Sequence, residues 1–447
     1  MQYFLETYGC QMNVADSELV AGLLEASGYR RSTRVDQANV VLLNTCAIRE
    51  KAEETVLHRL DQLAHLKRDD PSILIGLLGC MAKNLADSLL ETNPWVDLVL
   101  GPDSYRRLPE ILEQRRTSQD HVVDTRLSRF EVYDDLFPSR GGGVNAWISI
   151  MRGCDKFCTF CVVPFTRGRE RSRSLESILA EGESAVARGY PEVTLLGQNV
   201  NSYRHNGVRF PELLEAVAAT PGLRRIRYTS PHPSDVTRLL LEVMAAHHNI
   251  CKSIHLPLQA GADRILRRMQ RTYTRAEYLR LVAEIREVLP DCTLSTDIIV
   301  GFPGETEQDF QATLDVVREV GYDSAFTFKY SPRPGTKAAE YGDQVPPEVQ
   351  QERLERLLGL QKEIGLGRNQ MAVGRVLEVL VEKESKKSSA QWAGRSDGNK
   401  WVIFDKGPAR VGDFVDVWID SARGVVLKGH ILTPANQVGE EAYRAVA

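Results

Sequence analysis

In the first third of the 447-residue chain, apolar residues recur with two different spacings, one typical of strands and one typical of helices. Short apolar runs predict strands at 3–5, 40–44, 73–78 and 98–100. Longer stretches between them, such as 16–27 and 49–66, have the apolar spacing of helices. Strands alternating with helices at this spacing are typical of a parallel α/β sheet.

The Gly-rich segment SRGGGV at 139–144 predicts a domain boundary, after which the alternation resumes. Six strand–helix units in this length favour a partial (β/α)6 barrel, with a charged helix at 347–369 leading out of it. The predicted strands are 147–151, 193–196, 225–229, 253–256, 293–300 and 324–329, and the predicted helices are 175–188, 211–219, 234–246, 275–288 and 307–320.

From Gly374 onward, short strands separated by glycines predict a small antiparallel β-barrel of the size of an OB-fold. Its expected strands are 376–381, 400–404, 414–419 and 425–431. The chain is therefore expected to divide into an α/β domain (1–125), a barrel domain (139–370), a β domain (371–434) and a loose tail (435–447).

The net charge, the first residues and the longest apolar run exclude several classes of protein. The chain has 56 Lys and Arg against 60 Asp and Glu, a net charge of −4, which excludes a uniformly basic nucleic-acid coat. The first residues lack the basic and apolar regions of a signal peptide, and the longest apolar run, 73–82, is too short to cross a bilayer. We therefore expect a cytoplasmic protein without a membrane partner, in which patterned cysteines serve metal binding or catalysis.

Three of the eight cysteines follow predicted strands. Cys10, Cys46 and Cys80 each come after a strand of the first domain, and the carboxyl ends of parallel strands share one edge of the sheet. This placement favours convergence of the three thiols, although three separately buried small residues remain an alternative. Cys251 and Cys292 lack such a pattern and are expected to be buried.

Three more cysteines, Cys154, Cys158 and Cys161, form a C-x3-C-x2-C loop directly after the first barrel strand. Zinc would need a fourth ligand, yet no His lies between His121 and His205, and the next cysteine is Cys251. Three thiolates on one tight loop instead suit a four-iron cluster with one iron left open.

This loop resembles the cluster loop of the radical S-adenosylmethionine (SAM) superfamily. The segments TYGCQMN (7–13), NTCAIRE (44–50), 149–173 and 255–275 are similar to the methylthiotransferases of that superfamily, over essentially the whole chain. Among them, the similarity is greatest to the branch that modifies N6-dimethylallyladenosine in tRNA. The resemblance implies two [4Fe-4S] clusters, an auxiliary one on Cys10, Cys46 and Cys80 and a SAM-binding one on Cys154, Cys158 and Cys161.

The same resemblance implies the reaction and its partners. SAM would serve both as methyl donor and as radical source, and the product would carry a methylthio group on carbon 2 of adenosine 37, beside the anticodon. An unactivated carbon–hydrogen bond needs radical chemistry in a shielded pocket. The expected partners are the tRNA anticodon stem-loop, a sulfur donor and an electron donor such as flavodoxin or ferredoxin.

Further contacts to SAM are expected at strand ends, the catalytic face of such barrels. Phe160 would lie near the adenine of SAM, although plain packing explains it equally well. The other candidates are Gly197, Gln198 and Asn199 after the second strand, and Ser295 and Asp297 in the fifth. His255, at another strand end, is expected to be a hydrogen-bonded structural residue.

RNA binding must rest on local patches, because the net charge is negative. The candidates are Arg167, Arg169, Arg171 and Arg173 in one run, Arg267, Arg268 and Arg271 in a second, flanked by Arg264 and Arg275, and Lys383, Lys386 and Lys387 in a β–β connection of the last domain, which resembles the TRAM module. For any one arginine, a merely solvated surface is the alternative.

Two other functions are considered. The same chemistry could act on threonylcarbamoyl-adenosine in tRNA or on a ribosomal protein. Alternatively, the chain could be an iron–sulfur protein that binds RNA without catalysis. The intact C-x3-C-x2-C loop argues against the non-catalytic alternative.

Overall fold

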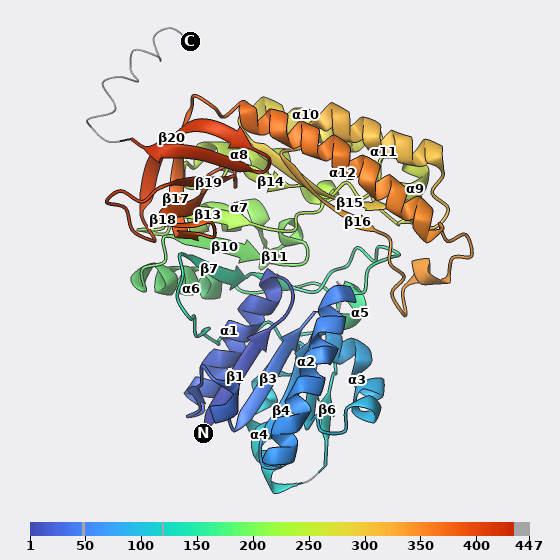
Figure 1. The fold of residues 1–447 in the computed structure, drawn as a ribbon, viewed down its shortest axis with the longest axis vertical. Coiled ribbons are helices and arrows are strands. Elements are labelled where there is room, and N and C mark those ends of the chain that lie inside the picture. Colours follow the sequence, from blue (N-terminus) through green and yellow to red (C-terminus); the bar gives the residue numbers. More distant parts are fainter. Residues whose placement is uncertain (47–49, 119, 433–447) are drawn as a thin grey trace.

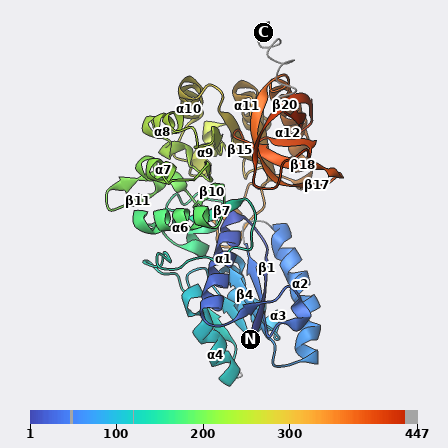
Figure 2. The same ribbon diagram turned by 90° about the vertical axis from the view of Figure 1, so that its left-hand side faces the viewer.

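The computed structural model describes residues 1–46, 50–118 and 120–432, and the tail expected at 435–447 lies outside them. The described chain has an N-terminal α/β domain at one end of the molecule (Figure 1, blue) and a half-barrel with a small closed β-barrel at the other (Figure 1, green to red). Figure 2 shows the small barrel beside the half-barrel. This confirms the predicted fold class.

The N-terminal domain is built on a parallel six-stranded sheet of order β2-β1-β3-β4-β5-β6. Its central strands β3 and β4 are buried along their whole length, which explains why they read as unbroken apolar runs. The elements are β1 Gln2–Thr7, α1 Gln11–Ala26, β2 Arg30–Arg31, β3 Val40–Thr45, α2 Glu50–Asp69, β4 Leu74–Gly79, α3 Cys80–Thr92, β5 Leu98–Leu100, α4 Leu108–Thr117 and β6 Val122–Asp124.

The half-barrel consists of two parallel three-stranded sheets, β13-β10-β7 and β14-β15-β16, linked by a parallel bridge between Ile226 and Ile250. The strands are β7 Asn145–Ser149, β10 Glu192–Leu196, β13 Arg225–Tyr228, β14 Ser253–His255, β15 Thr293–Val300 and β16 Ser324–Lys329. The larger helices are α6 Leu175–Ala187, α7 Phe210–Ala218, α8 Arg238–Ala246, α10 Arg275–Val288, α11 Glu307–Val320 and α12 Pro347–Gln370.

Shorter elements surround the half-barrel: β8 Met151–Arg152, α5 Val163–Arg167, β9 Arg171–Ser172, β11 Arg204–His205, β12 Val208–Arg209 and α9 Asp263–Arg268. The helix predicted at 234–246 begins later than expected. Val236 and Thr237 have extended backbone, and the Thr237 side chain caps α8 at its first turn.

The C-terminal barrel closes in the order β17-β18-β19-β21-β20. Four of its strand pairs are antiparallel, whereas β19 and β21 run parallel, so the barrel is not purely antiparallel. The sequence analysis missed β18 because its segment, SSAQWAGRS, is largely polar. The strands are β17 Val376–Ser385, β18 Ser388–Ser396, β19 Trp401–Asp405, β20 Phe414–Arg423 and β21 Val426–Ile431.

The small barrel is fixed to the amino-terminal ends of the half-barrel strands. Arg225 donates to the carbonyl of Arg395, and Arg227 donates to the carbonyls of Ser396 and Asp397. Arg227 also pairs with the buried carboxylate of Glu192 at 2.8 Å. The N-terminal domain packs near the opposite ends of β7 and β10. There, Leu196 at the end of β10 packs against Met12 and Ala15 of α1.

No helix in the described residues is long and apolar enough to span a bilayer.

Candidate functional site

The structure brings the first cysteine triad together at one edge of the N-terminal sheet. Cys10 lies between β1 and α1, Cys46 follows β3, and Cys80 begins α3 directly after β4. The approach is so close that a side chain at Gly9 would come within 2.5 Å of Cys46 Cβ. Gly9 (φ +138°) and Gly79 (φ +97°) therefore permit turns that other residues would strain and crowd.

The surroundings of this first triad shift the pKa values of two of its thiols in opposite directions. A hydrogen bond with Cys46, together with the nearby Arg167, lowers the pKa of Cys10 to about 6 against the opposing effect of burial. Burial raises the pKa of Cys80, opposed by Arg167, whose Nε donates to Cys80 Sγ at 3.1 Å. The guanidinium of Arg167 thus favours the charged form of two of the three thiols.

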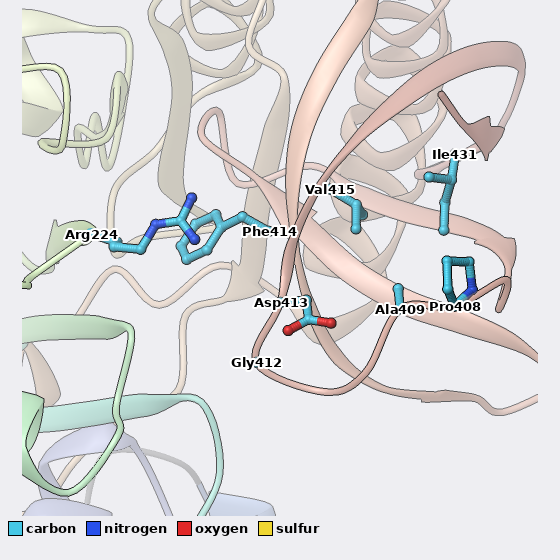
Figure 3. Close-up of a pocket in the computed structure, with 8 residues that line it drawn as sticks. All are labelled: Arg224, Pro408, Ala409, Gly412, Asp413, Phe414, Val415 and Ile431. Carbon is cyan, nitrogen blue, oxygen red and sulfur yellow. The ribbon is translucent and has the colours of Figure 1, made fainter. Parts of the chain in front are cut away.

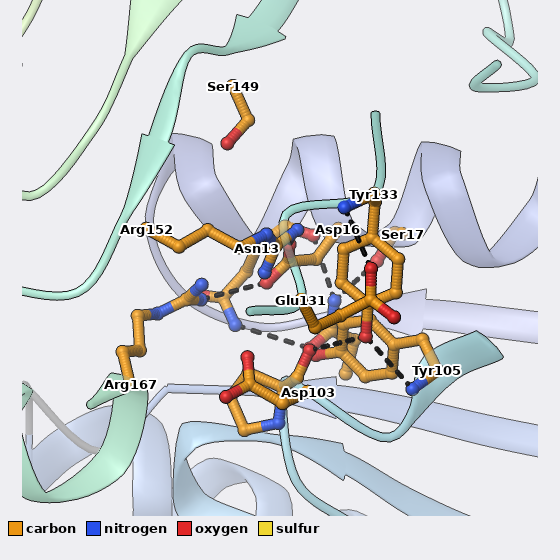
Figure 4. Close-up of polar contacts among 12 residues, drawn as sticks. Asn13, Asp16, Ser17, Asp103, Tyr105, Glu131, Tyr133, Ser149, Arg152 and Arg167 are labelled. Carbon is orange, nitrogen blue, oxygen red and sulfur yellow. Dashed lines mark hydrogen bonds and ion pairs between the residues drawn. The ribbon is translucent and has the colours of Figure 1, made fainter. Parts of the chain in front are cut away.

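Arg167 belongs to a buried ionic network between the N-terminal domain and the half-barrel (Figure 4). Asp16 of α1, fully buried, pairs with Arg152 Nη2 at 2.5 Å and with Arg167 Nη2 at 2.8 Å. The guanidinium of Arg152 also lies over the ring of Tyr133, 4.6 Å from its centroid. These contacts fix the N-terminal domain to the segments on either side of the cysteine loop.

The second triad occupies that loop, between β8 and α5. Gly153 has φ +80°, and a side chain there would meet the Arg169 carbonyl at 2.0 Å, so the loop folds back tightly on the segment that follows α5. Thr159 anchors the loop through its backbone N–H to the Met269 carbonyl and its hydroxyl to the Arg268 carbonyl. Arg271 Nη1 donates to Cys158 Sγ at 3.3 Å.

The thiols of the loop influence one another, which places them close together. Burial raises the pKa of Cys154 to about 11 and that of Cys161 to about 12, and repulsion from Cys158 contributes in both cases. Cys80 of the first triad packs against Val162, the neighbour of Cys161. The two triads therefore line the same interface between domains.

The chemistry of the donors fits iron–sulfur clusters. Within the residues that the structure describes, no group of His, Cys, Asp or Glu side chains could hold a metal ion as three or more ligands. The cysteines of a four-iron cluster each bind a different iron, so they need not surround one point. Three thiols with a buried guanidinium beside them provide both the ligands and a compensating positive charge.

The candidate SAM contacts after β10 have structural partners. Gln198 Oε1 accepts a 2.6 Å hydrogen bond from Gly153 N, which ties this strand end to the cysteine loop. Asn199 is buried between Asp235 and the backbone of His232. A side chain at Gly197 would approach Met151 Cγ to 2.6 Å. Of the three residues, Gln198 is the one whose side chain contacts the cysteine loop.

Ser295 and Asp297 lie on the face of β15 opposite its buried core face. Both contact His255: Ser295 Oγ is 3.0 Å from Nδ1, and Asp297 Oδ2 is 3.2 Å from Nε2. Phe326 of β16 lies directly across from Asp297, has its ring near that of His255 and is 55% exposed. These side chains form a polar and aromatic surface inside the open half-barrel.

Phe160, in the cysteine loop, packs edge-on against the buried ring of Phe302. Its side chain is partly exposed and adjoins the core of the half-barrel. It therefore has the packing contact considered as the alternative role. Cys251 and Cys292 are buried, as expected, and burial raises the pKa of each to about 12.

The first arginine run, predicted to bind RNA, does not form a continuous surface, because three of its four members are buried. Arg167 contacts Asp16 and Cys80, Arg171 pairs with Asp103 at 2.9 Å, and Arg173 pairs with Glu181 at 2.6 Å. All three are buried and already paired with carboxylates. Arg169, 67% exposed and paired with Asp155, is the remaining surface member.

The other basic candidates are placed differently. Arg267 is exposed, Arg268 pairs with Asp343, and Arg271 contacts Cys158. Lys386 and Lys387 form the exposed turn between β17 and β18, whereas Lys383 lies within β17 over the ring of Trp401. Arg264 and Arg275, which flank the second run, pair with Asp309 and Glu319.

A separate pocket of about 310 Å³ lies between the small barrel and the loop before β13 (Figure 3). Its lining contains none of the candidate residues. The guanidinium of Arg224 stacks over Phe414, 3.9 Å from the ring centroid. The lining residues are Arg224, Pro408, Ala409, Gly412, Asp413, Phe414, Val415 and Ile431.

Residues of the site that the sequence analysis missed include Asp16, Arg152 and Phe326. The only available signal for Arg152 is its position directly before Gly153 and Cys154. Nothing in the sequence places Asp16 opposite that loop, because the contact joins residues 136 positions apart.

Three family models match successive parts of the chain. The model described as Uncharacterized protein family UPF0004 matches residues 2–101, the Radical SAM superfamily matches 148–317, and the TRAM domain matches 370–432.

Similar proteins of known name extend over nearly the whole chain. A tRNA-2-methylthio-N(6)-dimethylallyladenosine synthase of Bacteroides thetaiotaomicron is 49% identical over 435 residues, covering 95% of each chain. Synthases of the same name from Porphyromonas gingivalis and Chloroherpeton thalassium are 48% and 46% identical, covering 97% and 96% of this chain and 96% of each relative.

Solved structures share the fold at low identity. The radical S-adenosylmethionine methyltransferase TsrM from Kitasatospora setae superposes with a TM-score of 0.58 at 16% identity, covering 76% of this chain and 74% of TsrM. The cobalamin-dependent S-adenosylmethionine radical enzyme OxsB gives 0.54 at 14% identity, covering 81% of this chain and 56% of OxsB.

Proposed function

Because the chain belongs to the tRNA-2-methylthio-N(6)-dimethylallyladenosine synthases, we propose that it adds a methylthio group to carbon 2 of N6-dimethylallyladenosine 37 in tRNA. The observation that carries this proposal is the pair of cysteine triads lining one buried interface, with Cys80 packed on Val162. A methylthiolation needs both a radical source and a site for sulfur within reach of one substrate.

We assign the two triads to two clusters. Cys154, Cys158 and Cys161 hold the cluster that binds SAM, and Cys10, Cys46 and Cys80 hold the auxiliary one. When bound, the clusters and SAM supply the electron, the radical and the methylthio group. The chain's own residues orient these groups: Gln198 holds Gly153, Thr159 holds the loop on α9, and Asp16 fixes both sides of the loop.

We place the target adenosine and SAM on the inner surface of the half-barrel, formed by His255, Ser295, Asp297 and Phe326. Exposed aromatic rings beside polar groups suit a base taken out of an RNA loop, which is read by stacking and edge contacts. The dimethylallyl group is apolar and would be shielded from water by the same ring.

For RNA contacts we propose the exposed cations Arg169, Arg267, Lys383, Lys386 and Lys387. We assign one role to each domain. Residues 1–125 hold the auxiliary cluster, residues 139–370 carry out the radical chemistry, and residues 371–434 form a TRAM-like domain that contacts the anticodon stem-loop. An electron donor such as flavodoxin or ferredoxin and a sulfur donor complete the system. Because free thiols and clusters persist in reducing conditions, we place the enzyme in the cytoplasm.

The test compares full-length Cys46→Ala and Cys154→Ala after anaerobic reconstitution, with Cys292→Ala as the control outside both triads. The wild type and the control should bind about eight irons, and each triad variant about four. Cys46→Ala should cleave SAM without methylthiolating tRNA, whereas Cys154→Ala should do neither.

Mass spectrometry of nucleosides from the treated tRNA identifies the product. If Cys46→Ala still methylthiolates, or if the wild type binds about four irons, the two-cluster assignment is wrong. Activity on threonylcarbamoyl-adenosine tRNA, but not on dimethylallyladenosine tRNA, would support the alternative substrate.

A further inference from the structure

One arginine joins the two cysteine triads physically. Arg167 ends α5, the short helix that follows Cys161 of the loop, yet its Nε donates to Cys80 Sγ of the other triad at 3.1 Å. Its side chain is 4% exposed, so water does not weaken this contact appreciably. The segment that holds one triad therefore supplies a hydrogen bond to a sulfur of the other.

The orientation of Arg167 is fixed by a buried carboxylate. Asp16 Oδ2 accepts from Arg167 Nη2, while Asp16 Oδ1 accepts from Arg152 Nη2. Burial tends to raise the pKa of Asp16, but the two guanidinium groups hold it below its ordinary value, so the carboxylate is charged. Asp16 lies on α1, whose first turn begins directly after Cys10, so both ends of this contact are tied to triad residues.

The charge of this group of residues is not balanced by protein alone. Three buried arginine side chains, Arg152, Arg167 and Arg171, face two buried aspartate side chains, Asp16 and Asp103, which leaves an excess positive charge beside the first triad. Arg167 Nη1 is buried and has no hydrogen-bond partner among the described residues. A buried charge and a buried donor without partners destabilise the folded chain. An anionic group bound at the triad would compensate the charge and accept the hydrogen bond.

We propose that Arg167 is a positioning residue that raises the reduction potential of the auxiliary cluster by donating to Cys80 Sγ. The reduction potential of an iron–sulfur cluster depends on its net charge and on hydrogen bonds to its sulfurs. A guanidinium stabilises the reduced, more negative state and therefore raises the potential. This inference rests on the proposed function, because it requires a cluster at the first triad.

The test measures that potential in the full-length chain with the loop cysteines replaced, C154A/C158A/C161A, so that one cluster gives the signal. Redox titration followed by electron paramagnetic resonance is carried out with and without Arg167→Gln and Arg167→Lys. Arg167→Gln should shift the midpoint to a more negative potential, and Arg167→Lys by a smaller amount, because lysine keeps the charge but not the geometry of Nε.

Arg169→Gln is the matched control, since Arg169 lies two residues away but points to solvent and pairs with Asp155. Its potential should equal that of the parent. A merely structural role for Arg167 would alter cluster content or stability without moving the midpoint of the iron that remains bound.

The outcomes separate the inference from the proposed function. If the loop-cysteine variant binds no iron, the auxiliary cluster itself is wrong. If it binds about four irons and both Arg167 variants keep the parent midpoint, the inference alone is overturned. If Arg167→Gln cannot be loaded with iron, the Arg167→Lys midpoint decides, and an unchanged value again overturns the inference.

Discussion

Arg271 Nη1 lies 3.3 Å from Cys158 Sγ, and its guanidinium also stacks over the ring of Tyr273. Arg271 thus donates to a sulfur of the loop triad, just as Arg167 donates to a sulfur of the first triad. Each triad has one arginine that donates to one of its sulfurs, and this arginine is buried at the first triad and partly buried at the loop triad. The two sites differ in their effect on the thiols, because the pKa of Cys10 is lowered whereas those of Cys154 and Cys161 are raised.

Arg271→Gln should therefore shift the midpoint potential of the loop cluster to a more negative value. The measurement uses a chain with C10A/C46A/C80A, in which only the loop cluster remains. Exposed Arg267 on α9 offers the control, because Arg267→Gln should leave the midpoint unchanged. An unchanged midpoint in Arg271→Gln would contradict the pairing of Arg271 with the loop cluster.

Phe326→Ala should weaken binding of the substrate tRNA, because stacking of one base on an aromatic ring contributes about 1–3 kcal/mol. We expect KM for dimethylallyladenosine tRNA to rise roughly 5- to 150-fold, with iron content and SAM binding retained. Phe137→Ala removes an equally exposed ring from the segment before β7 and should have no such effect. An unchanged KM for Phe326→Ala would exclude stacking on this ring.

Replacing Lys386 and Lys387 together by alanine tests the contact of the small barrel with RNA. If both neutralise phosphates, the slope of log affinity against log salt should become shallower by about 1.4–1.8. Lys362→Ala, on the exposed side of α12, is the control. Affinity should be followed by fluorescence anisotropy of a labelled anticodon stem-loop at several salt concentrations, and an unaltered slope would remove this turn from the interface.

His232 gives the protein a defined response to acid. Burial, with contributions from Arg271 and Lys156, lowers its pKa to about 2, and its Nδ1 accepts from Ser234 N. The unfolded chain binds a proton here below about pH 6.5, whereas the folded chain does not until about pH 2. Stability contributed by this residue is therefore present above pH 6.5 and lost as the pH falls through that window.

His232→Asn should flatten this response. Between pH 7.5 and 5.5 the midpoint of urea unfolding should fall less in His232→Asn than in the wild type, since each pH unit below 6.5 costs the wild type at most about 1.4 kcal/mol at this group. The exposed His248 should not matter, and His248→Asn should follow the wild type. Equal slopes in all three proteins would show that His232 titrates normally in the folded chain.

Most strands of the fold could be predicted because they are strongly apolar. Leu98–Leu100 has the predicted bounds because a buried parallel strand leaves an unbroken apolar signal. Thr293–Val300 also has the predicted bounds, although its buried and half-buried positions mostly alternate. Ser388–Ser396 was missed because its sequence is largely polar, although the strand pairs with two neighbouring strands of the barrel. Barrel closure is a long-range property that local patterning does not carry.

The placement of Cys10, Cys46 and Cys80 after successive strands favoured their convergence, but the sequence could not distinguish buried from exposed arginines. Arg167, Arg169, Arg171 and Arg173 read as one basic patch, yet three of them are buried against carboxylates. Arg167 and Arg171 pair with Asp16 and Asp103, far away in sequence, and Arg173 pairs with Glu181, eight residues away. A residue's charge says nothing about which partner it will meet. The distinction between a surface cation and an interdomain one appears only when Asp16 and Asp103 are placed opposite them in three dimensions.

The bond between Asp16 and Arg167 spans 151 residues, and this separation has a consequence for biosynthesis. At typical translation speeds Arg167 is made roughly 8–30 s after Asp16, so the N-terminal domain can emerge and fold before the partner of its buried carboxylate exists. Until Arg167 is made, Asp16 lacks this partner, and the segment that packs on the edge carrying the first triad is not yet present. The contact that fixes Arg167 beside Cys80 is therefore among the later ones to form as the chain is synthesised.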